Sequence, residues 1–118
     1  MKAYTDIFQS KKLAEILPLE SADMYYCYGM DIHTKGWSFD DTPTIIDNSN
    51  RIDVHVDIPC WSLATLLDIL HYPHLEQNYK GKWCCRTEYA DTTYLWEADN
   101  PVDACYEIII RLYELNLL

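Results

Sequence analysis

The stretch from Asp99 to Leu118 carries the strongest helix signals in the chain. Asn100 can cap a helix, because its side chain can accept a hydrogen bond from a free backbone N–H group of the first turn. Pro101 follows at the first helical position, where a missing N–H costs nothing. Asp103 then places a negative charge near the positive end of the helix dipole. We therefore predict a helix that begins after Asn100 and organises the rest of the fold.

The apolar residues of this helix cover a wide arc. At about 100° per residue, the charged residues share one narrow arc, and they are Asp103, Glu107, Arg111 and Glu114. Most of the remaining circumference is apolar, formed by Val102, Cys105, Ile108, Ile109, Leu112, Tyr113 and Leu115. An ordinary surface helix has one apolar stripe. We therefore expect contacts on two sides: the final hairpin on one, and either the 63–70 helix or a partner on the other.

Two further helices and several strands are predicted upstream. Thr5 or Asp6 can cap a helix that ends at Leu17, before Pro18, and a second helix runs from Pro59 or Ser62 to His71. Residues 24–32 alternate well enough for a strand, 34–36 read as a tight loop, and 37–39 begin a returning strand. A short extended piece is expected at 44–46, and 74–78 are expected to connect the second helix to the next strand. Apolar and polar residues alternate over 52–58, which is typical of a strand with one solvent-exposed face. Pro59 is expected to end this strand.

The last two strands, 79–89 and 93–98, form the most specific local prediction. One face of the first carries Tyr79, Trp83, Cys85, Thr87 and Tyr89. A loop with an even number of residues around Ala90 and Asp91 places Cys85 opposite Trp96 and keeps the aromatic residues on one face. A loop with an odd number of residues would exchange the two faces of the second strand. Ala90-Asp91 is a poor two-residue hairpin turn, so a four-residue loop is favoured.

These elements predict a single α+β domain spanning residues 1–118. We expect an antiparallel sheet of about four strands with three helices packed mainly on one face. Short connections favour antiparallel pairing over parallel crossovers. A length of 118 residues is enough to bury one core without disulfides.

Charge and cysteine content narrow the class of protein. Nineteen acidic residues against nine basic ones give a formal charge of −10. This charge weighs against binding to nucleic acid or an anionic membrane, which requires Lys and Arg. There is no apolar run long enough to span a membrane and no apolar signal-peptide core. Five cysteines without a signal peptide favour reduced thiols in a cytoplasmic setting. No phosphate-binding loop or nucleophile elbow is present, so we expect neither a cofactor nor a catalytic residue.

Asp53, His55 and Asp57 form the first tentative site. On a strand these side chains share one face, about 7 Å apart. Two carboxylates beside a histidine can raise its pKa or help to hold a metal ion. Alternation alone also produces this pattern on a solvated strand face. The solvated face is the favoured interpretation, and no metal ligand is assigned.

Lys80, Lys82 and Arg86 form the second tentative site, a patch for a protein partner. With Tyr25, Tyr72 and Tyr79, these basic residues could present an amphipathic surface. Tyrosine and arginine are enriched in such interfaces. Aromatic residues scattered over an ordinary surface are the simpler interpretation.

Three segments resemble an uncharacterised family of small proteins from gut bacteria, often encoded by phage or mobile elements. The segments are Tyr4-Thr5-Asp6 with 9–18, Ile58-Pro59-Cys60-Trp61-Ser62-Leu63-Ala64, and Asn100–Cys105 with 114–118. The resemblance covers roughly a third of the chain by our count of those segments. It implies a bacterial, cytoplasmic setting and carries over no catalytic residue.

Three functions from different classes are therefore considered. The first is a non-enzymatic accessory or protein-interaction module, with another protein as the candidate partner and the oligomeric state left open. The second is an acidic mimic of nucleic acid that blocks a DNA-binding enzyme, which requires dense rows of carboxylates. The third is a small metal-dependent enzyme built on Asp53, His55 and Asp57.

Overall fold

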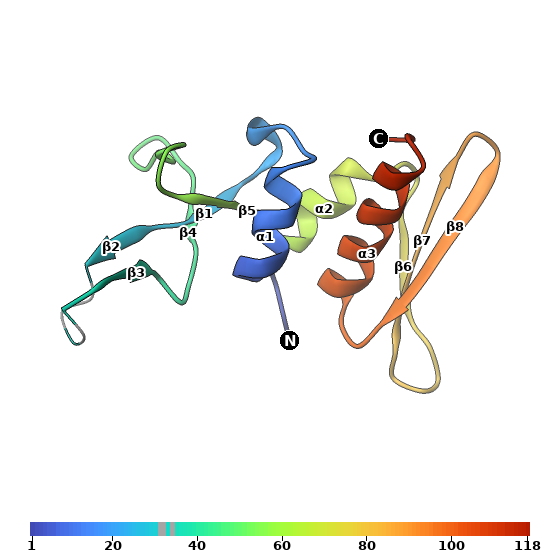
Figure 1. The fold of residues 1–118 in the computed structure, drawn as a ribbon. Coiled ribbons are helices and arrows are strands. Elements are labelled where there is room, and N and C mark those ends of the chain that lie inside the picture. Colours follow the sequence, from blue (N-terminus) through green and yellow to red (C-terminus); the bar gives the residue numbers. More distant parts are fainter. Residues whose placement is uncertain (31–32, 34) are drawn as a thin grey trace. The chain divides into compact units, whose positions relative to one another are not determined.

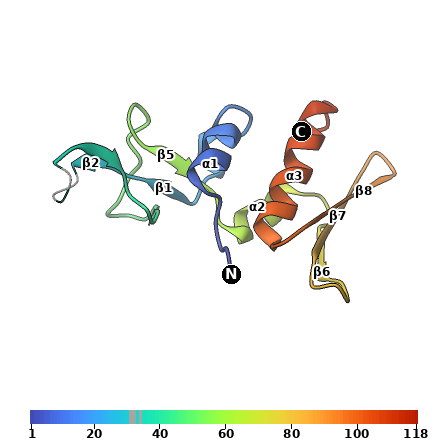
Figure 2. The same ribbon diagram turned by 60° about the horizontal axis from the view of Figure 1, so that its bottom comes forward.

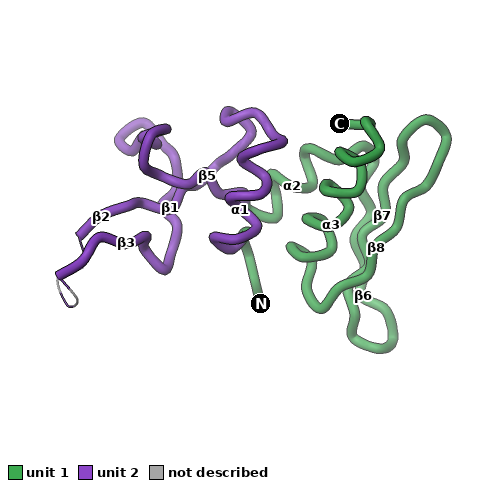
Figure 3. The backbone as a smooth tube through the Cα atoms, in the orientation of Figure 1, with its two compact units in different colours: residues 1–5, 62–118 green, residues 6–61 purple. Residues whose placement is uncertain are grey.

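The chain folds into two compact units of mixed α and β structure. The computed structural model describes residues 1–30, 33 and 35–118. Unit 1 comprises Met1–Thr5 and Ser62–Leu118, and unit 2 comprises Asp6–Trp61 (Figure 3). The described residues form three α-helices, one 3-10 turn and eight strands in three antiparallel sheets. The α+β class is confirmed, whereas a single domain over 1–118 stays a prediction.

Unit 1 is a three-stranded sheet with two helices. Its elements are α2 (Leu63–Ile69), β6 (His74–Gln77), β7 (Trp83–Tyr89), β8 (Thr92–Ala98) and α3 (Pro101–Glu114). The strand order is β6-β7-β8. Helix α3 lies along β7 and β8 and also packs against α2 (Figures 1 and 2). The prediction that α3 is contacted on two sides is confirmed.

Helix α3 begins as its sequence predicts. The Asn100 side chain accepts a hydrogen bond from the Asp103 N–H at 2.9 Å, and Pro101 occupies the first helical turn. At the other end, Asn116 has a φ of 59° and the Leu117 N–H donates to the Leu112 carbonyl at 2.9 Å. A left-handed residue at this position satisfies carbonyl groups that the helix end leaves free.

Replacing Asn100 with alanine is expected to lower the free energy of unfolding by about 1 kcal/mol, because the first turn of α3 loses its side-chain acceptor. Glycine at the same position is expected to cost only a few tenths of a kcal/mol. Urea denaturation of the two variants measures both effects. Equal losses for alanine and glycine would contradict the capping role.

The hairpin of β7 and β8 has the predicted register. Cys85 lies opposite Trp96 and Thr87 opposite Tyr94. The prediction of a four-residue loop is wrong, because Tyr89 pairs with Thr92 and leaves Ala90 and Asp91 as a two-residue loop. Both loop residues have positive φ, 50° and 63°. Those angles are typical of a type I′ turn, whose twist matches that of the flanking strands.

The segment before β7 differs from the prediction. Residues His74–Gln77 form strand β6, paired with β7, instead of a connector. Tyr79 lies outside β7 and is 94% exposed, so it does not belong to the buried face of the sheet. Gly81, with a φ of 82°, supplies the left-handed conformation that the intervening turn requires.

The core of unit 1 lies between α3, α2 and one face of the sheet. Its fully or nearly fully buried side chains include Leu66, Leu70, Cys85, Thr87, Val102, Cys105, Ile108, Ile109 and Leu112. The Cys105 thiol donates to the Cys85 sulfur at 3.6 Å, which joins α3 to the middle of β7. The alternation of β7, with every second residue from Cys85 buried, matches a sheet covered on one face.

Unit 2 contains one helix and two small sheets. Its elements are α1 (Ile7–Ala14), a 3-10 turn (Leu19–Ser21), β1 (Met24–Tyr26), β2 (Tyr28–Met30), β3 (Trp37–Phe39), β4 (Thr44–Ile45) and β5 (Ile58–Cys60). The sheets are β4-β1-β5 and β2-β3, and α1 packs against β5. Asp6 and Gln9 exchange side-chain and backbone hydrogen bonds, which cap α1 as a reciprocal box.

Two strand predictions in unit 2 need correction. The expected strand over 24–32 divides at Cys27 into β1 and β2, which join different sheets. Its last residues, Asp31 and Ile32, and Thr34 of the expected loop lie outside the described residues. The expected strand over 52–58 is wrong, because 54–56 form a turn and β5 starts only at Ile58. Pro59 lies inside β5 and does not end it, which an edge strand tolerates.

The predicted single sheet of about four strands is also wrong. The strands form sheets of three, two and three strands instead. Helix α1 belongs to unit 2, whereas α2 and α3 belong to unit 1, so the helices are not gathered on one face of one sheet. The break at Cys27 divides the predicted 24–32 strand, and the 54–56 turn leaves only Ile58 of the predicted 52–58 strand in a sheet.

Candidate functional site

Asp53, His55 and Asp57 lie in a turn, not on a strand face. The Asp57 N–H donates to the Asp53 carbonyl at 2.8 Å, and the Asp53 N–H donates back to the Asp57 carboxylate at 2.8 Å. The Asp53 carboxylate also accepts a hydrogen bond from the His55 N–H at 3.0 Å, and its carbonyl accepts one from the Val56 N–H at 3.1 Å. Carboxylates that accept nearby backbone N–H groups stabilise turns. The predicted solvated strand face is therefore replaced by a closed turn.

The other carboxylate oxygen of Asp57 connects this turn to strand β2. It accepts a hydrogen bond from the Tyr28 N–H at 3.1 Å. Both carboxylates are therefore engaged by backbone groups of unit 2. Among the described residues, no group of three or more His, Cys, Asp and Glu side chains is arranged to hold a metal ion.

Strands β2 and β3 carry large side chains on one face. Tyr28 lies opposite Phe39 and Met30 lies opposite Trp37, so these four side chains share a face of the two-stranded ribbon. The Tyr28 ring lies 4.9 Å from that of Phe39 and 5.8 Å from that of Trp37, measured between centroids. The opposite face holds Gly29 and Ser38, and a Cβ at Gly29 would meet only open space. The ribbon is therefore one-sided.

This aromatic face is exposed. Trp37 is 62% exposed and Met30 is 59% exposed. Tyr28, Phe39, His55 and Val56 line an open recess beside it. We call Tyr28, Met30, Trp37, Phe39, His55 and Val56 together the hairpin patch. Exposed apolar surface of this kind marks interaction sites in soluble proteins.

Several acidic residues lie close to the hairpin patch in the chain or in the fold. Residues 6–61 contain ten acidic and four basic residues. Asp40 and Asp41 directly follow β3, and Asp53 and Asp57 hold the turn beside the recess.

The Cys27 thiol has a raised pKa. Burial is the largest cause, and the negative charges of Asp57 and Asp40 add to it. Cys27 therefore stays protonated at neutral pH and is not an activated nucleophile.

A cation already contacts the patch. The Lys11 Nζ lies 5.7 Å from the centroid of the Phe39 ring. An ammonium group at this distance is attracted by the negative face of the ring. The surrounding carboxylates favour the same sign of charge. A cationic side chain is therefore complementary both to the aromatic rings and to the nearby carboxylates.

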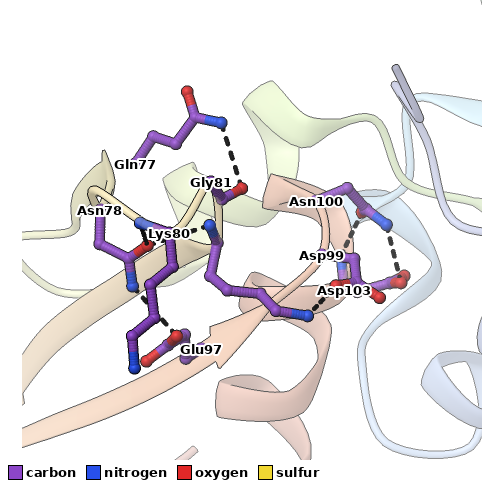
Figure 4. A network of polar contacts seen from close by, with 9 residues as sticks. Gln77, Asn78, Lys80, Gly81, Glu97, Asp99, Asn100 and Asp103 are labelled. Carbon is purple, nitrogen blue, oxygen red and sulfur yellow. Dashed lines mark hydrogen bonds and ion pairs between the residues drawn. The ribbon is translucent and has the colours of Figure 1, made fainter.

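The structure divides the predicted Lys80, Lys82 and Arg86 patch between a turn and a strand. Lys80 and Lys82 lie in the turn between β6 and β7, which Asn78 holds together (Figure 4). The Asn78 Oδ1 accepts from the N–H groups of both lysines, at 3.0 Å each, and its Nδ2 donates to Glu97 at 3.0 Å. Arg86 is exposed in the middle of β7.

A nearby acid offsets the charge of one of these basic residues. The Lys82 Nζ pairs with Asp99, and that hydrogen bond raises the pKa of Lys82. Cys84 lies opposite Glu76 of β6 and opposite Glu97 of β8. The pKa of its thiol is raised, mainly because of burial. Whether the three basic residues form a partner patch stays a prediction. Of the tyrosines expected there, Tyr72 and Tyr79 are exposed, but Tyr25 is buried.

Sequence reasoning missed the hairpin patch. It placed Tyr28 and Met30 in one long strand over 24–32, and Trp37 and Phe39 at the start of a returning strand, without assigning a site to any of them. The available signal was the presence of two short segments rich in large apolar residues, 28–30 and 37–39, with a turn glycine, Gly36, between them. The break at Cys27, which separates β2 from the buried strand β1, has no distinct sequence mark.

Comparison with known proteins provides no relative. No protein-family model, no curated protein and no solved structure matches this chain. Within the described part of the chain, none of the helices has both the length and the apolar character needed to cross a membrane.

Proposed function

We propose that this protein is a non-enzymatic protein-interaction module that binds a cationic segment of a partner protein through the hairpin patch. The single observation that supports this function best is the exposed aromatic face of β2 and β3, with Trp37 62% exposed. Tryptophan and tyrosine are the residue types that contribute most binding energy in protein interfaces.

The composition of the patch indicates the chemistry of the partner. Its centre is aromatic, and its rim is acidic because Asp40, Asp41, Asp53 and Asp57 lie near it in the chain and fold. Arginine can place its planar guanidinium on an aromatic face while pairing with a carboxylate. A segment that alternates Arg or Lys with apolar residues therefore complements both parts of the patch.

The cellular setting is part of the same proposal. The resemblance of three segments to small proteins of gut bacteria and mobile elements supports a bacterial, cytoplasmic protein. The high net negative charge of −10 supports a protein partner over nucleic acid or an anionic membrane. An accessory role requires no catalytic residue.

Selection from a library of random peptides displayed on phage tests the proposed function. Peptides that bind the protein are expected to be enriched in Arg or Lys together with Leu, Phe or Trp. Replacing Trp37 with serine is expected to weaken their binding about 30-fold, the equivalent of a 2 kcal/mol hot spot. Tyr72→Ser, which changes another exposed aromatic residue outside the patch, serves as the matched control. Enriched peptides that bind both variants equally would contradict the proposal.

An acidic mimic of nucleic acid is the second candidate, supported by ten acidic against four basic residues in 6–61. The two candidates predict different sensitivities. A mimic depends on carboxylates, so Asp40→Asn with Asp41→Asn would abolish binding while Trp37→Ser would not. The proposed module loses most of its binding through Trp37 and a smaller part through the two aspartates.

A further inference from the structure

Strand β8 is an edge of the sheet in unit 1. It pairs with β7 through all seven of its residues, from Thr92 to Ala98. Among the described strands, none pairs with its outer side. The two-residue loop makes Tyr89 and Thr92 the closing pair of the hairpin, and antiparallel pairs alternate in their hydrogen bonding. The backbone groups of Thr93, Leu95 and Glu97 are therefore directed outward, away from β7.

This edge lacks the features that protect exposed strands. Natural edge strands are kept short or carry proline and lysine. Strand β8 has seven residues, no proline, no lysine and one charged residue, Glu97. Its central residue, Leu95, is 60% exposed. The opposite edge, β6, has only four residues, follows Pro73 and carries Glu76. The two edges of the same sheet thus differ in how readily they accept another strand.

The outward residues of β8 are complementary to themselves. In an antiparallel pair centred on Leu95, Leu95 lies opposite the partner's Leu95, and Thr93 lies opposite the partner's Glu97. No like charges then face each other, which would be destabilising. A pair centred on Glu97 would instead oppose two carboxylates. The centred register uses the full strand and forms about six backbone hydrogen bonds.

We propose that two copies of this chain associate through antiparallel pairing of their β8 edges, centred on Leu95, to form one continuous six-stranded sheet. This surface lies in unit 1, so the inference does not depend on the hairpin patch of unit 2. The occupant is a second copy because the edge pairs with itself without a charge conflict.

A pocket beside the edge fits this association. It has a volume of about 260 Å³, and its lining includes Thr93, Tyr94, Leu95, Trp96, Arg111 and Leu115. The Arg111 guanidinium lies 5.6 Å from the centroid of the Trp96 ring. In the centred register, Tyr94 lies opposite the partner's Trp96 on the face that α3 covers. Each copy therefore brings an aromatic side chain to the other's pocket.

Sedimentation velocity over a wide range of protein concentration tests the association. The wild-type chain is expected to shift from monomer to dimer as its concentration rises, and the dimer is expected to strengthen with added salt because each copy carries a charge of −10. Hydrogen–deuterium exchange, measured separately over the same concentration range, is expected to show slower exchange of the outward amides of Thr93, Leu95 and Glu97 as the dimer forms. A chain that stays monomeric at all concentrations would overturn the proposal.

Two lysine substitutions in the same strand separate this register from any other contact. Leu95→Lys places two like charges at the centre of the pair and is expected to weaken the dimer at least about tenfold. Thr93→Lys places a lysine opposite the partner's Glu97 and is expected to tighten it about two- to tenfold. Both variants add one positive charge at an exposed position, so their net charges are matched, and circular dichroism checks that both fold. Equal effects of the two would show that the copies associate elsewhere and would overturn the proposal.

Discussion

Replacing Trp61 with alanine is expected to lower the free energy of unfolding by about 3–5 kcal/mol, the range for large aromatic residues removed from a core. Trp61 is completely buried, and its indole N–H donates to the Ser21 hydroxyl at 2.9 Å. The alanine variant loses the apolar contacts of the ring and leaves a cavity. Chemical denaturation followed by circular dichroism measures the loss.

Trp37→Ala is the matched control for this prediction, because it removes the same side chain from a position that is 62% exposed. Its effect on the free energy of unfolding is expected to stay below about 1 kcal/mol. A similar loss for both variants would mean that burial does not distinguish the two tryptophans. It would also mean that the hairpin patch is part of a core instead of a free surface.

Replacing Leu112 with alanine is expected to cost about 2–5 kcal/mol. Leu112 is completely buried in α3, the helix that packs against both α2 and the β7–β8 hairpin. Leu115→Ala, three residues later and 47% exposed, makes the same chemical change near the end of the helix and is expected to cost less than about 1 kcal/mol. Thermal unfolding of the two variants compares them. A large loss at Leu115 with none at Leu112 would contradict the packing of α3.

The parts of the fold that could be predicted are those in which local signals agree with tertiary contacts. Asn100 and Pro101 mark the start of α3, and Ser62, whose side chain accepts from the Thr65 N–H, marks the start of α2. The register of β7 and β8 followed from the need to keep Cys85 and Trp96 on one covered face. In each case, the residues that predict the helix or strand pairing from the sequence also stabilise it in the structure.

The parts that could not be predicted depend on competition between patterns. Residues 52–58 alternate as a strand does, but the carboxylates of Asp53 and Asp57 accept backbone N–H groups and close a turn instead. Aspartate side chains offer the backbone an alternative to a sheet ladder. Alternation alone cannot reveal which arrangement prevails, because the same residues satisfy both.

The candidate site was hidden for a related reason. The tentative polar residues Asp53, His55 and Asp57 do lie beside the hairpin patch, since Asp57 accepts from the Tyr28 N–H and His55 lines the recess. Their alternation predicts a strand face, whereas Trp37 and Phe39 are predicted only as part of a returning strand. An exposed aromatic residue and a buried one look alike in a sequence until the pairing of their strand is known.

The four tryptophans provide a direct test of the central proposal, that the hairpin patch binds a cationic segment. Each indole N–H gives its own NMR signal, so the signals of Trp37, Trp61, Trp83 and Trp96 report on separate positions. The chain is titrated with a peptide of alternating Arg and Leu and, separately, with the matching Glu and Leu peptide. We predict that the Arg peptide shifts the Trp37 signal first, leaves that of the buried Trp61 unchanged, and that the Glu peptide shifts neither. Shifts confined to Trp83 and Trp96, or a Trp37 signal that responds to both peptides alike, would contradict the proposal.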